Sequence, residues 1–455
     1  MAKMLVNFQS PIPFCFPLRA MVRGCVLIVL TATPWQVNAQ NINPSAGRTE
    51  VVKDSGEFQA FTLRQLLEAA LATHPSLQAA RLQARASAQD VKVTERQRWP
   101  TIAVTTETDT GTRASVATRS LRVEQIVWDA GRNTARITEA ENRLNIAHAQ
   151  VRLQQQDLFI QIINAWQNMV GAVERRSVAV DTLVLLKGYQ EQMLRRVQAQ
   201  ASSRIDLELV DARVLQTEVE KTTADTSLKV ALSRLEQLSG LTGLSRRLGQ
   251  LPNAPSDDNT EMFHQILEQT NWQLVASEQA AVAKARLEGE LVKTQLTTKQ
   301  AEQWPQFYVR LDKPLGTTQT NPITTTSVFA GLRYTPGAGF ATALEAQAIA
   351  TRIQSQDQTI EAVNREIQQS LESDREEFAN ARLRIVALEK SVKGSRLVLD
   401  SYLRQFQAGR KTWQDLLNTA RDLAQNQYSL ADAKSSLVGA LHRLQLRMDK
   451  SPEFP

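Results

Sequence analysis

The residue types that most often carry catalysis are present in this sequence, but they do not gather into a recognisable pattern. The four histidines are scattered, without the spacing of metal ligands: His74, His148, His264 and His442. Four carboxylates fall within six residues of a helix-favouring stretch: Glu372, Asp374, Glu376 and Glu377. We interpret them as a solvated helix face in preference to an ion site. Serine, histidine and aspartate form no hydrolase pattern and the glycines form no phosphate-binding loop. We therefore expect no catalytic residue, no cofactor, no metal site and no enzyme activity.

The N-terminal segment has the features of a secretory signal. Three basic residues precede an apolar run at 26–30, and residues 37–39 form a plausible cleavage site. The run is too short to span a bilayer, so a membrane anchor is the weaker interpretation. We predict a signal peptide over 1–39 and a leader over 40–61, with translation from Met21 as an alternative start.

The two cysteines, Cys15 and Cys25, both lie in this segment, so the mature chain has no thiol. Disulfides, cysteine catalysis and zinc–thiolate sites are excluded for the mature protein. The formal net charge of +6 falls to +3 without residues 1–39, and this weak surplus is interpreted as spread along the chain. It gives no reason to propose nucleic acid as a partner.

The remaining composition is typical of long helices. Aromatic residues make up only 5% of the chain. Helix-favouring residues dominate the stretches 62–98, 132–250 and 340–448. Extended helices are therefore expected in place of compact mixed domains.

An internal repeat organises the chain. Residues 194–207 align without a gap on residues 403–416, an offset of 209 residues. In the second copy, apolar residues recur every seven positions in two series: Leu371, Phe378, Ile385, Val392, Leu399 and Phe406, then Leu416, Leu423, Leu430, Leu437 and Leu444. The corresponding stripe of the first copy is more polar. A sustained seven-residue period predicts supercoiled helices packed side by side.

Each repeat has the same predicted plan of helix, β-hairpin, long helix, tip turn and returning helix. The first repeat spans 62–240, with a helix over about 62–98, a hairpin over 101–127, a long helix over 132–198 and a helix over 203–238. After a linker at 241–259, the second repeat spans 260–448, with a helix to about 303, a hairpin over 306–334, a long helix over 342–408 and a helix over 412–448, followed by a tail at 449–455.

Tryptophan and glycine mark the ends of the strands. Each first helix stops at a Trp-Pro pair, because proline disfavours helix in the preceding residue; the pairs are Trp99-Pro100 and Trp304-Pro305. Glycine-bearing turns join the hairpins to the long helices, at Trp128, Gly131 and Gly339. The tryptophans suit either an interfacial aromatic belt or ordinary core packing.

Four strands with open edges cannot close a barrel alone, and open edges are not tolerated in hydrocarbon. Several copies would therefore pool their strands, eight in a dimer or twelve in a trimer. An eight-stranded barrel is nearly filled by its own side chains, so an open conduit favours at least twelve strands. The function that follows from this plan is passage.

Over residues 62–448 the chain resembles the TolC family of outer-membrane export proteins. The resemblance rests on the opening helix at 66–77, with His74 where asparagine is usual, on the strand-to-helix junction at 121–132, and on the turns at 195–207 and 404–416. It implies a mainly α protein with a small β part: a homotrimer with a twelve-stranded transmembrane β-barrel and a periplasmic α-helical coiled-coil tunnel. It also implies the outer membrane of a Gram-negative cell, contact with outer-membrane lipid, and docking onto a periplasmic adaptor (membrane fusion) protein joined to an inner-membrane ABC transporter or proton-driven pump.

The resemblance also implies a gate at the periplasmic entrance. The family's acidic ring falls on Asp415, while Asn418 replaces a second ring carboxylate. The gating contacts fall on Asp206, Phe406 and Lys411, where the family has aspartate, tyrosine and arginine. Phe406 has no hydroxyl and Lys411 lacks the bidentate fork of arginine, so we expect a looser closed state.

The tip turns are the expected adaptor-docking surface. Their docking positions are Arg195, Ala199, Gln200 and Ser203 in the first turn and Arg404, Ala408, Gly409 and Thr412 in the second. Ser203 and Thr412, each with an aspartate three residues later, also have the pattern of helix N-caps. Capping alone is the alternative interpretation of these residues.

Three function classes remain open. An export conduit is favoured, and the segment 405–418 resembles members that serve type I secretion, particularly of large adhesins. Small-molecule efflux is the alternative cargo class. A secreted coiled-coil or adhesion stalk would explain the heptads and the signal but leaves the paired hairpins unexplained.

Overall fold

The computed structural model describes residues 61–109, 116–245, 257–315, 325–335 and 337–448. The chain divides into two units between Glu57 and Phe58, and every described residue belongs to the second. The expected signal peptide, nearly all of the leader, most of the linker and the tail lie outside the described residues.

The elements of the first repeat follow the expected order. They are α1 (Leu63–Thr73), α2 (Pro75–Arg96), β1 (Thr101–Asp109), β2 (Val116–Trp128), α3 (Arg132–Gln198) and α4 (Arg204–Ser239). The second repeat consists of α5 (Asp257–Gln269), α6 (Trp272–Glu278), α7 (Ala280–Glu302), β3 (Gln306–Pro314), β4 (Ser327–Arg333), the 3₁₀ turn η2 (Ala338–Phe340), α8 (Ala341–Gln407) and α9 (Trp413–Met448). Helices α3 and α8 each have 67 residues and α4 and α9 each have 36. Both pairs start 209 residues apart, the offset of the sequence repeat.

The first helix of each repeat is interrupted, and its expected continuity was wrong. At His74 the backbone is extended (φ −66°, ψ 124°), and Pro75 then begins α2, since proline lacks the donor that a continuing helix needs. In the second repeat Asn271 caps α6, its side chain accepting from the backbone N–H of Leu274 at 3.2 Å. The chain breaks again at Gln279. Helix α5 also begins inside the segment expected to be linker.

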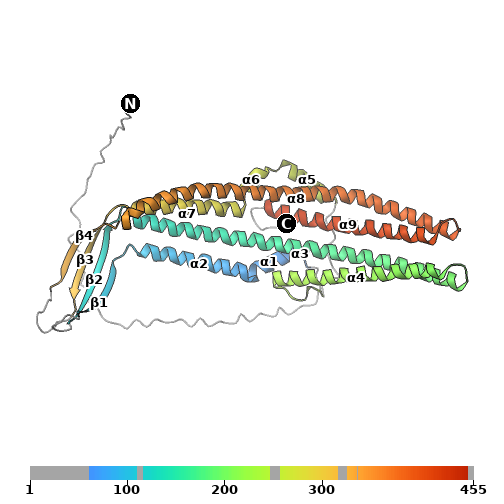
Figure 1. Cartoon of the computed structure of the whole chain (residues 1–455), viewed down its shortest axis with the longest axis horizontal. Helices are drawn as coiled ribbons and strands as arrows, with labels where there is room; N and C mark the ends of the chain where they lie inside the picture. The colour runs from blue at the N-terminus through green and yellow to red at the C-terminus, as the bar shows by residue number, and fades with distance from the viewer. Residues whose placement is uncertain (1–60, 110–115, 246–256, 316–324, 336, 449–455) are drawn as a thin grey trace, which may run out of the picture. The chain divides into compact units, whose positions relative to one another are not determined.

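The helices of this unit run side by side. Helix α3 packs along α4, and α8 along α9, while α7 and the end of α9 lie between α3 and α8 (Figure 1). The sheet lies at one end of these helices and both tip turns at the other (Figure 1). The tips and the strands are therefore separate sites joined by continuous helices.

The heptad positions form the contacts between the helices. Leu371, Phe378 and Leu399 of α8 are buried, as are Leu416, Leu423, Leu437 and Leu444 of α9. The polar stripe of the first repeat is an ion-pair stripe, in which Arg176 of α3 and Lys221 of α4 both contact the carboxylate of Asp225, at 2.7 and 3.2 Å. These cations are satisfied within the helix pair.

Each returning helix ends against the break in the first helix of its repeat. The hydroxyl of Thr73 donates to the carbonyl of Ser239 at 3.0 Å, and the amide of Gln279 donates to the carbonyl of Arg447 at 2.9 Å. Carbonyls at a helix C-terminus have no partner within their own helix. The interruptions therefore supply the groups that cap α4 and α9.

We expect Gln279→Leu to lower the free energy of unfolding by about 1–3 kcal/mol. Gln279 is buried, and its amide donates to Val275 and Arg447 and accepts from Gln156, so leucine would leave buried carbonyls without donors. Urea titration of the purified protein measures the loss. Thr73→Val is the matched control: Thr73 is exposed, so its loss should be well under half as large. Equal losses at the two junctions would contradict this account.

Candidate functional site

The β-hairpins of the two repeats form one antiparallel sheet in the order β1-β2-β3-β4. Among the strands that the structure describes, β1 pairs only with β2 and β4 only with β3. Both outer edges thus present backbone donors and acceptors that have no strand partner in the part of the chain that the structure describes. Such edges pair with further strands or are covered.

One face of the sheet is apolar. The register places Ile102 opposite Val123, Val104 opposite Leu121, and Leu311 opposite both Val123 and Val328. Cross-strand partners share a face, as do alternate residues of one strand. Large apolar side chains of this face are exposed, among them Ile102 at 69%, Val104 at 66%, Val328 at 67% and Leu332 at 55%.

The opposite face is charged. Asp312 contacts both Arg122 and Arg310, at 2.9 and 3.0 Å, and Glu124 contacts Arg333 at 2.9 Å. The guanidinium groups of Arg310 and Arg333 lie over the rings of Phe329 and Tyr308, 4.8 and 4.7 Å from their centres. The strands are thus joined by ion pairs between residues as far apart in sequence as Glu124 and Arg333.

Gly331 makes room for this packing. A Cβ atom there would lie 2.5 Å from the ring of Tyr308, its cross-strand partner. Only glycine lets that ring lie flat across β4, where Arg333 stacks on it.

The exposure of the two faces is inverted with respect to a water-soluble protein. Along β3 the exposed positions are Phe307, Val309 and Lys313, while Tyr308, Arg310 and Asp312 of the charged face are partly buried. In water, apolar side chains collect on the protected face. Along β3, the apolar face is instead the more exposed of the two.

The strand-end residues lie where the sequence predicted. Trp99, Trp304 and Trp128 are 74%, 60% and 46% exposed, so core packing within this chain is excluded for them. Pro100 and Pro305 directly precede β1 and β3. The ring of Trp128 lies 5.6 Å from that of Phe307.

At the junction between strands and long helices, the predicted Gly131 and Gly339 have positive φ, +82° and +60°. Two further residues of this junction, Asp129 and Arg132, were missed by sequence reasoning. The Asp129 carboxylate caps α3, accepting from the backbone N–H groups of Gly131 at 3.1 Å and Asn133 at 2.8 Å. Arg132 donates to the carbonyls of Glu302 and Trp304, both at 3.3 Å. It therefore ties the start of α3 to the end of α7.

The two tip turns have the same backbone path. In the first, Gln200 has φ +58° and the N–H of Ala201 donates to the carbonyl of Arg196 at 2.8 Å. In the second, Gly409 has φ +71° and the N–H of Arg410 donates to the carbonyl of Gln405 at 2.8 Å. These are helix C-terminal turns with a left-handed residue, the conformation that glycine adopts most readily. Gln200 adopts it at some strain.

The returning helices are capped differently. Thr412 and Asp415 form a reciprocal pair, in which each backbone N–H donates to the other's side chain at 3.2 Å. The donors on Thr412 lower the pKa of Asp415, so its carboxylate is ionised at neutral pH. In the first turn Ser203 accepts from the N–H of Ile205 at 3.2 Å. Capping is thus shown at both tips, while docking stays a prediction.

Trp413 joins the two tips, and sequence reasoning did not single it out. Its indole N–H donates to the backbone carbonyl of Asp206 at 2.9 Å. Its buried ring lies 5.1 Å from Phe406 and 5.8 Å from Tyr189. Burial raises the pKa of Tyr189 to about 12, so its hydroxyl stays neutral.

Two of the expected gate residues, Phe406 and Asp206, contact this tryptophan. Phe406 packs between Trp413 and the guanidinium of Arg196, which lies 4.9 Å from its ring centre. Lys411 lies 4.4 Å from the ring centre of Tyr402 and 4.0 Å from the carboxylate of Asp415. Asn418 is half-buried on the first turn and a half of α9. Asp206 contributes its backbone carbonyl to Trp413.

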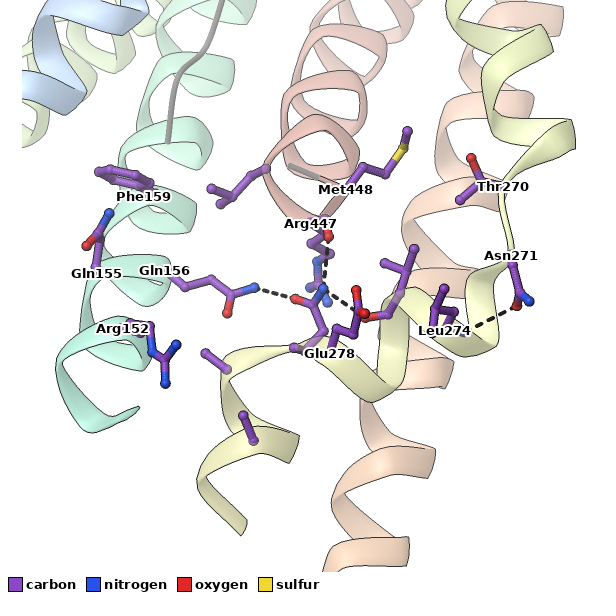
Figure 2. Close-up of a pocket in the computed structure, with 15 residues that line it drawn as sticks. Arg152, Gln155, Gln156, Phe159, Thr270, Asn271, Leu274, Glu278, Arg447 and Met448 are labelled. Carbon is purple, nitrogen blue, oxygen red and sulfur yellow. Dashed lines mark hydrogen bonds between the residues drawn. The ribbon is translucent and has the colours of Figure 1, made fainter. Parts of the chain in front are cut away.

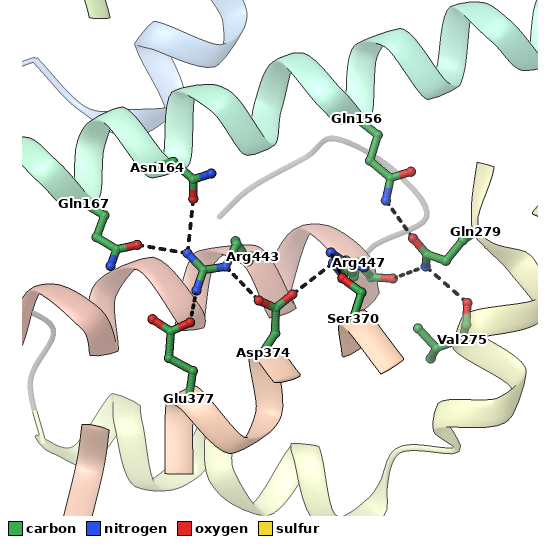
Figure 3. Close-up of polar contacts among 10 residues, drawn as sticks. All are labelled: Gln156, Asn164, Gln167, Val275, Gln279, Ser370, Asp374, Glu377, Arg443 and Arg447. Atoms are coloured by element: carbon green, nitrogen blue, oxygen red, sulfur yellow. Dashed lines mark hydrogen bonds and ion pairs between the residues drawn. The ribbon is translucent and has the colours of Figure 1, made fainter. Parts of the chain in front are cut away.

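A buried ion cluster joins α3, α8 and α9 between the tips and the sheet. Arg443 contacts Asp374 at 2.8 Å and Glu377 at 2.6 Å, and donates to Gln167 of α3 at 2.9 Å (Figure 3). Arg447 lies 3.2 Å from the same Asp374 (Figure 3). Asp374 is only 8% exposed, so the solvated-face interpretation was wrong for it. The acidic group at 372–377 faces a neighbouring helix through two of its members.

A cavity of about 700 Å³ lies where α9 ends against α6 and α7. Arg152, Gln155, Gln156 and Phe159 of α3 form one wall and Leu274 and Glu278 another (Figure 2). Within the described residues no cluster of histidine, cysteine, aspartate or glutamate could hold a metal ion. None of the helices described is long and apolar enough to cross a membrane.

Comparison with known proteins agrees with this arrangement. Residues 66–241 match the family model described as outer membrane efflux protein. No curated protein sequence matches the chain. Among solved structures, CusC is similar at 14% identity with a TM-score of 0.73, covering 85% of this chain and 91% of that one. The outer membrane protein VceC from Vibrio cholerae is 16% identical, with a TM-score of 0.73 and coverage of 85% and 95%. A membrane protein from Pseudomonas aeruginosa is also 16% identical, with a TM-score of 0.73 and coverage of 85% and 92%.

Over the described residues, the chain has the fold of these solved outer-membrane proteins, with long paired helices joined to a small antiparallel sheet. The match of residues 66–241 to the outer membrane efflux protein model and the shared fold both agree with the resemblance seen in the sequence.

Proposed function

We propose that this protein is the passive outer-membrane conduit of a tripartite export system in a Gram-negative cell. Three chains would pool twelve strands into one barrel and their long helices into one periplasmic tunnel, with no catalytic step. The conduit would receive cargo from a periplasmic adaptor and an inner-membrane ABC transporter or proton-driven pump.

The inverted sheet is the observation that carries this proposal. Its apolar face suits outer-membrane lipid, and its charged face suits a water-filled lumen. Its two edges, unpaired among the described strands, suit pairing of β4 with β1 of the next copy. A coiled-coil stalk in water would gain nothing from exposing Ile102 and Val104.

The first test is assembly and conductance. The purified full-length product should migrate as a heat-sensitive trimer, fractionate with the outer membrane and conduct ions in planar lipid bilayers. A monodisperse monomer that stays soluble without detergent would refute the proposal.

We expect Val104→Arg to abolish stable insertion and Thr105→Arg to be tolerated. The two residues are adjacent in β1 and face opposite sides of the sheet. An arginine facing lipid costs about 2–4 kcal/mol near the midplane, and three copies would share one barrel. Thr105→Arg loses only the 2.8 Å bond to Ser120. Outer-membrane yield of trimer measures the difference, and equal yields would show that the apolar face does not meet lipid.

For the cargo we propose type I secretion of a large adhesin. The support is the second tip at 405–418, which resembles members that serve such systems. Small-molecule efflux is the second candidate, favoured by the family description. In a deletion strain, loss of one large secreted protein with unchanged drug susceptibility would support secretion, and the reverse result would support efflux.

A further inference from the structure

The net positive charge of the mature chain is found in its two tip segments. The repeat-aligned segments 194–207 and 403–416 contain six cations and two carboxylates. The cations are Arg195, Arg196 and Arg204 in the first segment and Arg404, Arg410 and Lys411 in the second; the carboxylates are Asp206 and Asp415. The net charge of these two segments, +4, exceeds the +3 of the whole chain without its signal. The surplus is therefore not spread along the chain, as the sequence pattern had suggested.

The fold brings both segments together. The bond from Trp413 to Asp206 and the stacking of Arg196 on Phe406 hold the first turn beside the second. Both turns lie at the end of the helices away from the sheet (Figure 1). The two basic segments therefore lie beside each other at the same end of each chain.

Most of this charge faces solvent. Arg195, Arg404 and Arg410 are exposed, and no ion pair engages them among the described residues. Arg204 is 86% exposed, with Glu208 at 3.8 Å. Of the carboxylates, Asp415 is held by the hydroxyl and N–H of Thr412. Local carboxylates thus leave most of the arginines available.

The two repeats also place their exposed arginines in register. Arg195 and Arg404 occupy the same position of the repeat, in the last turn of α3 and of α8. Small residues follow at the apex: Ala199 and Ala201 in one turn, Ala408 and Gly409 in the other, all exposed. Small apex residues let another backbone approach closely between the arginines.

We infer that the tips dock a partner protein through an acidic surface, with Arg195 and Arg404 as its main contacts. This inference rests on the proposed function, in which the tip meets the adaptor, and it specifies the chemistry of that partner: carboxylates that approach in repeated positions. Guanidinium groups pair bidentately with carboxylates, and such rim charges set the association rate and its salt dependence.

The test measures binding of the purified channel, in detergent, to a purified periplasmic adaptor protein from the same cell. The tip variant combines Arg195→Gln and Arg404→Gln. The control variant combines Lys229→Gln and Arg384→Gln, which remove the same charge from exposed positions of α4 and α8 away from the turns. Each variant is first checked for trimer formation and for conductance equal to that of the wild type.

At about 0.15 M salt the tip variant should bind the adaptor about tenfold more weakly than the control variant. The difference in affinity between the two variants should disappear near 1 M salt, because exposed charges are screened within about 3 Å at that concentration. Tip and control variants that bind equally at every salt concentration would overturn the inference. So would a tip variant that loses binding to vesicles containing phosphatidylglycerol but keeps the adaptor, since the arginines would then serve lipid.

The two proposals fail in different ways. A wild-type protein that neither forms trimers nor conducts would refute the proposed conduit. A conducting trimer that binds the adaptor equally well with and without Arg195 and Arg404 would refute only the inference of an acidic docking surface.

Discussion

Arg443→Ala should lower the free energy of unfolding by about 3–5 kcal/mol, because it leaves a buried carboxylate without its main partner. The arginine joins α9 to Asp374 and Glu377 of α8 and to Gln167 of α3. Alanine would leave Asp374, 8% exposed, with only Arg447 at 3.2 Å. Burial already lowers the pKa of Arg447, so this cation is itself poorly solvated and compensates weakly.

The matched control is Arg175→Ala. Arg175 of α3 also pairs with an aspartate of α9, Asp432, through two bonds of 2.6 Å. Those side chains are 50% and 43% exposed, so water replaces the lost partner and the cost should stay below about 1 kcal/mol. Urea titrations of both variants give the comparison. If the two costs were equal, burial of the Arg443 cluster would have no energetic consequence.

Trp413→Ala should open the tip. The substitution removes a buried indole from contact with Tyr189 and Phe406 and deletes the bond to the carbonyl of Asp206. Truncating a buried tryptophan typically costs about 3–5 kcal/mol of folding free energy. Here the lost contacts lie where the two tip turns meet. We therefore expect a several-fold rise in single-channel conductance in planar bilayers.

Two further variants separate packing from hydrogen bonding. Trp413→Phe keeps an aromatic ring but loses the indole donor, so an intermediate conductance is expected. Asp206→Ala keeps the accepting backbone carbonyl and should conduct close to the wild type. An Asp206→Ala channel as open as Trp413→Ala would place the restraint in the carboxylate and contradict the assignment to the indole.

Within one chain, contacts around Trp413 connect the two tip turns. The resemblance implied side-chain contacts among Asp206, Phe406 and Lys411, and two of these residues depart from the family pattern. In the structure, the packing of Phe406 on Trp413 and of Arg196 on Phe406 connects the two tip turns. Phe406 therefore contributes through its ring, without the hydroxyl that a tyrosine would offer.

Features that depend on neighbours in sequence were predictable from sequence alone. The long helices begin and end within one residue of their predicted bounds, because Gly131, Gly409 and the Thr412–Asp415 pair act within a single turn of chain. The alternation of apolar and polar residues predicted the strands for the same reason, since side chains of a strand alternate between faces. Local geometry was enough in these places.

Features that depend on which helix faces which required the tertiary structure. Asp374 reads as one of four hydrated carboxylates, yet Arg443, 69 residues later, buries it. In the sequence, Trp413 is only the residue after a helix cap, yet its indole N–H donates to a carbonyl 207 residues earlier. The breaks at His74 and Gln279 look like weak points of one helix. In the structure, a side chain at or beside each break donates to the last carbonyls of a returning helix. The period of a helix gives its apolar stripe, but only the packing of several helices decides which polar groups lose water and which partner replaces it.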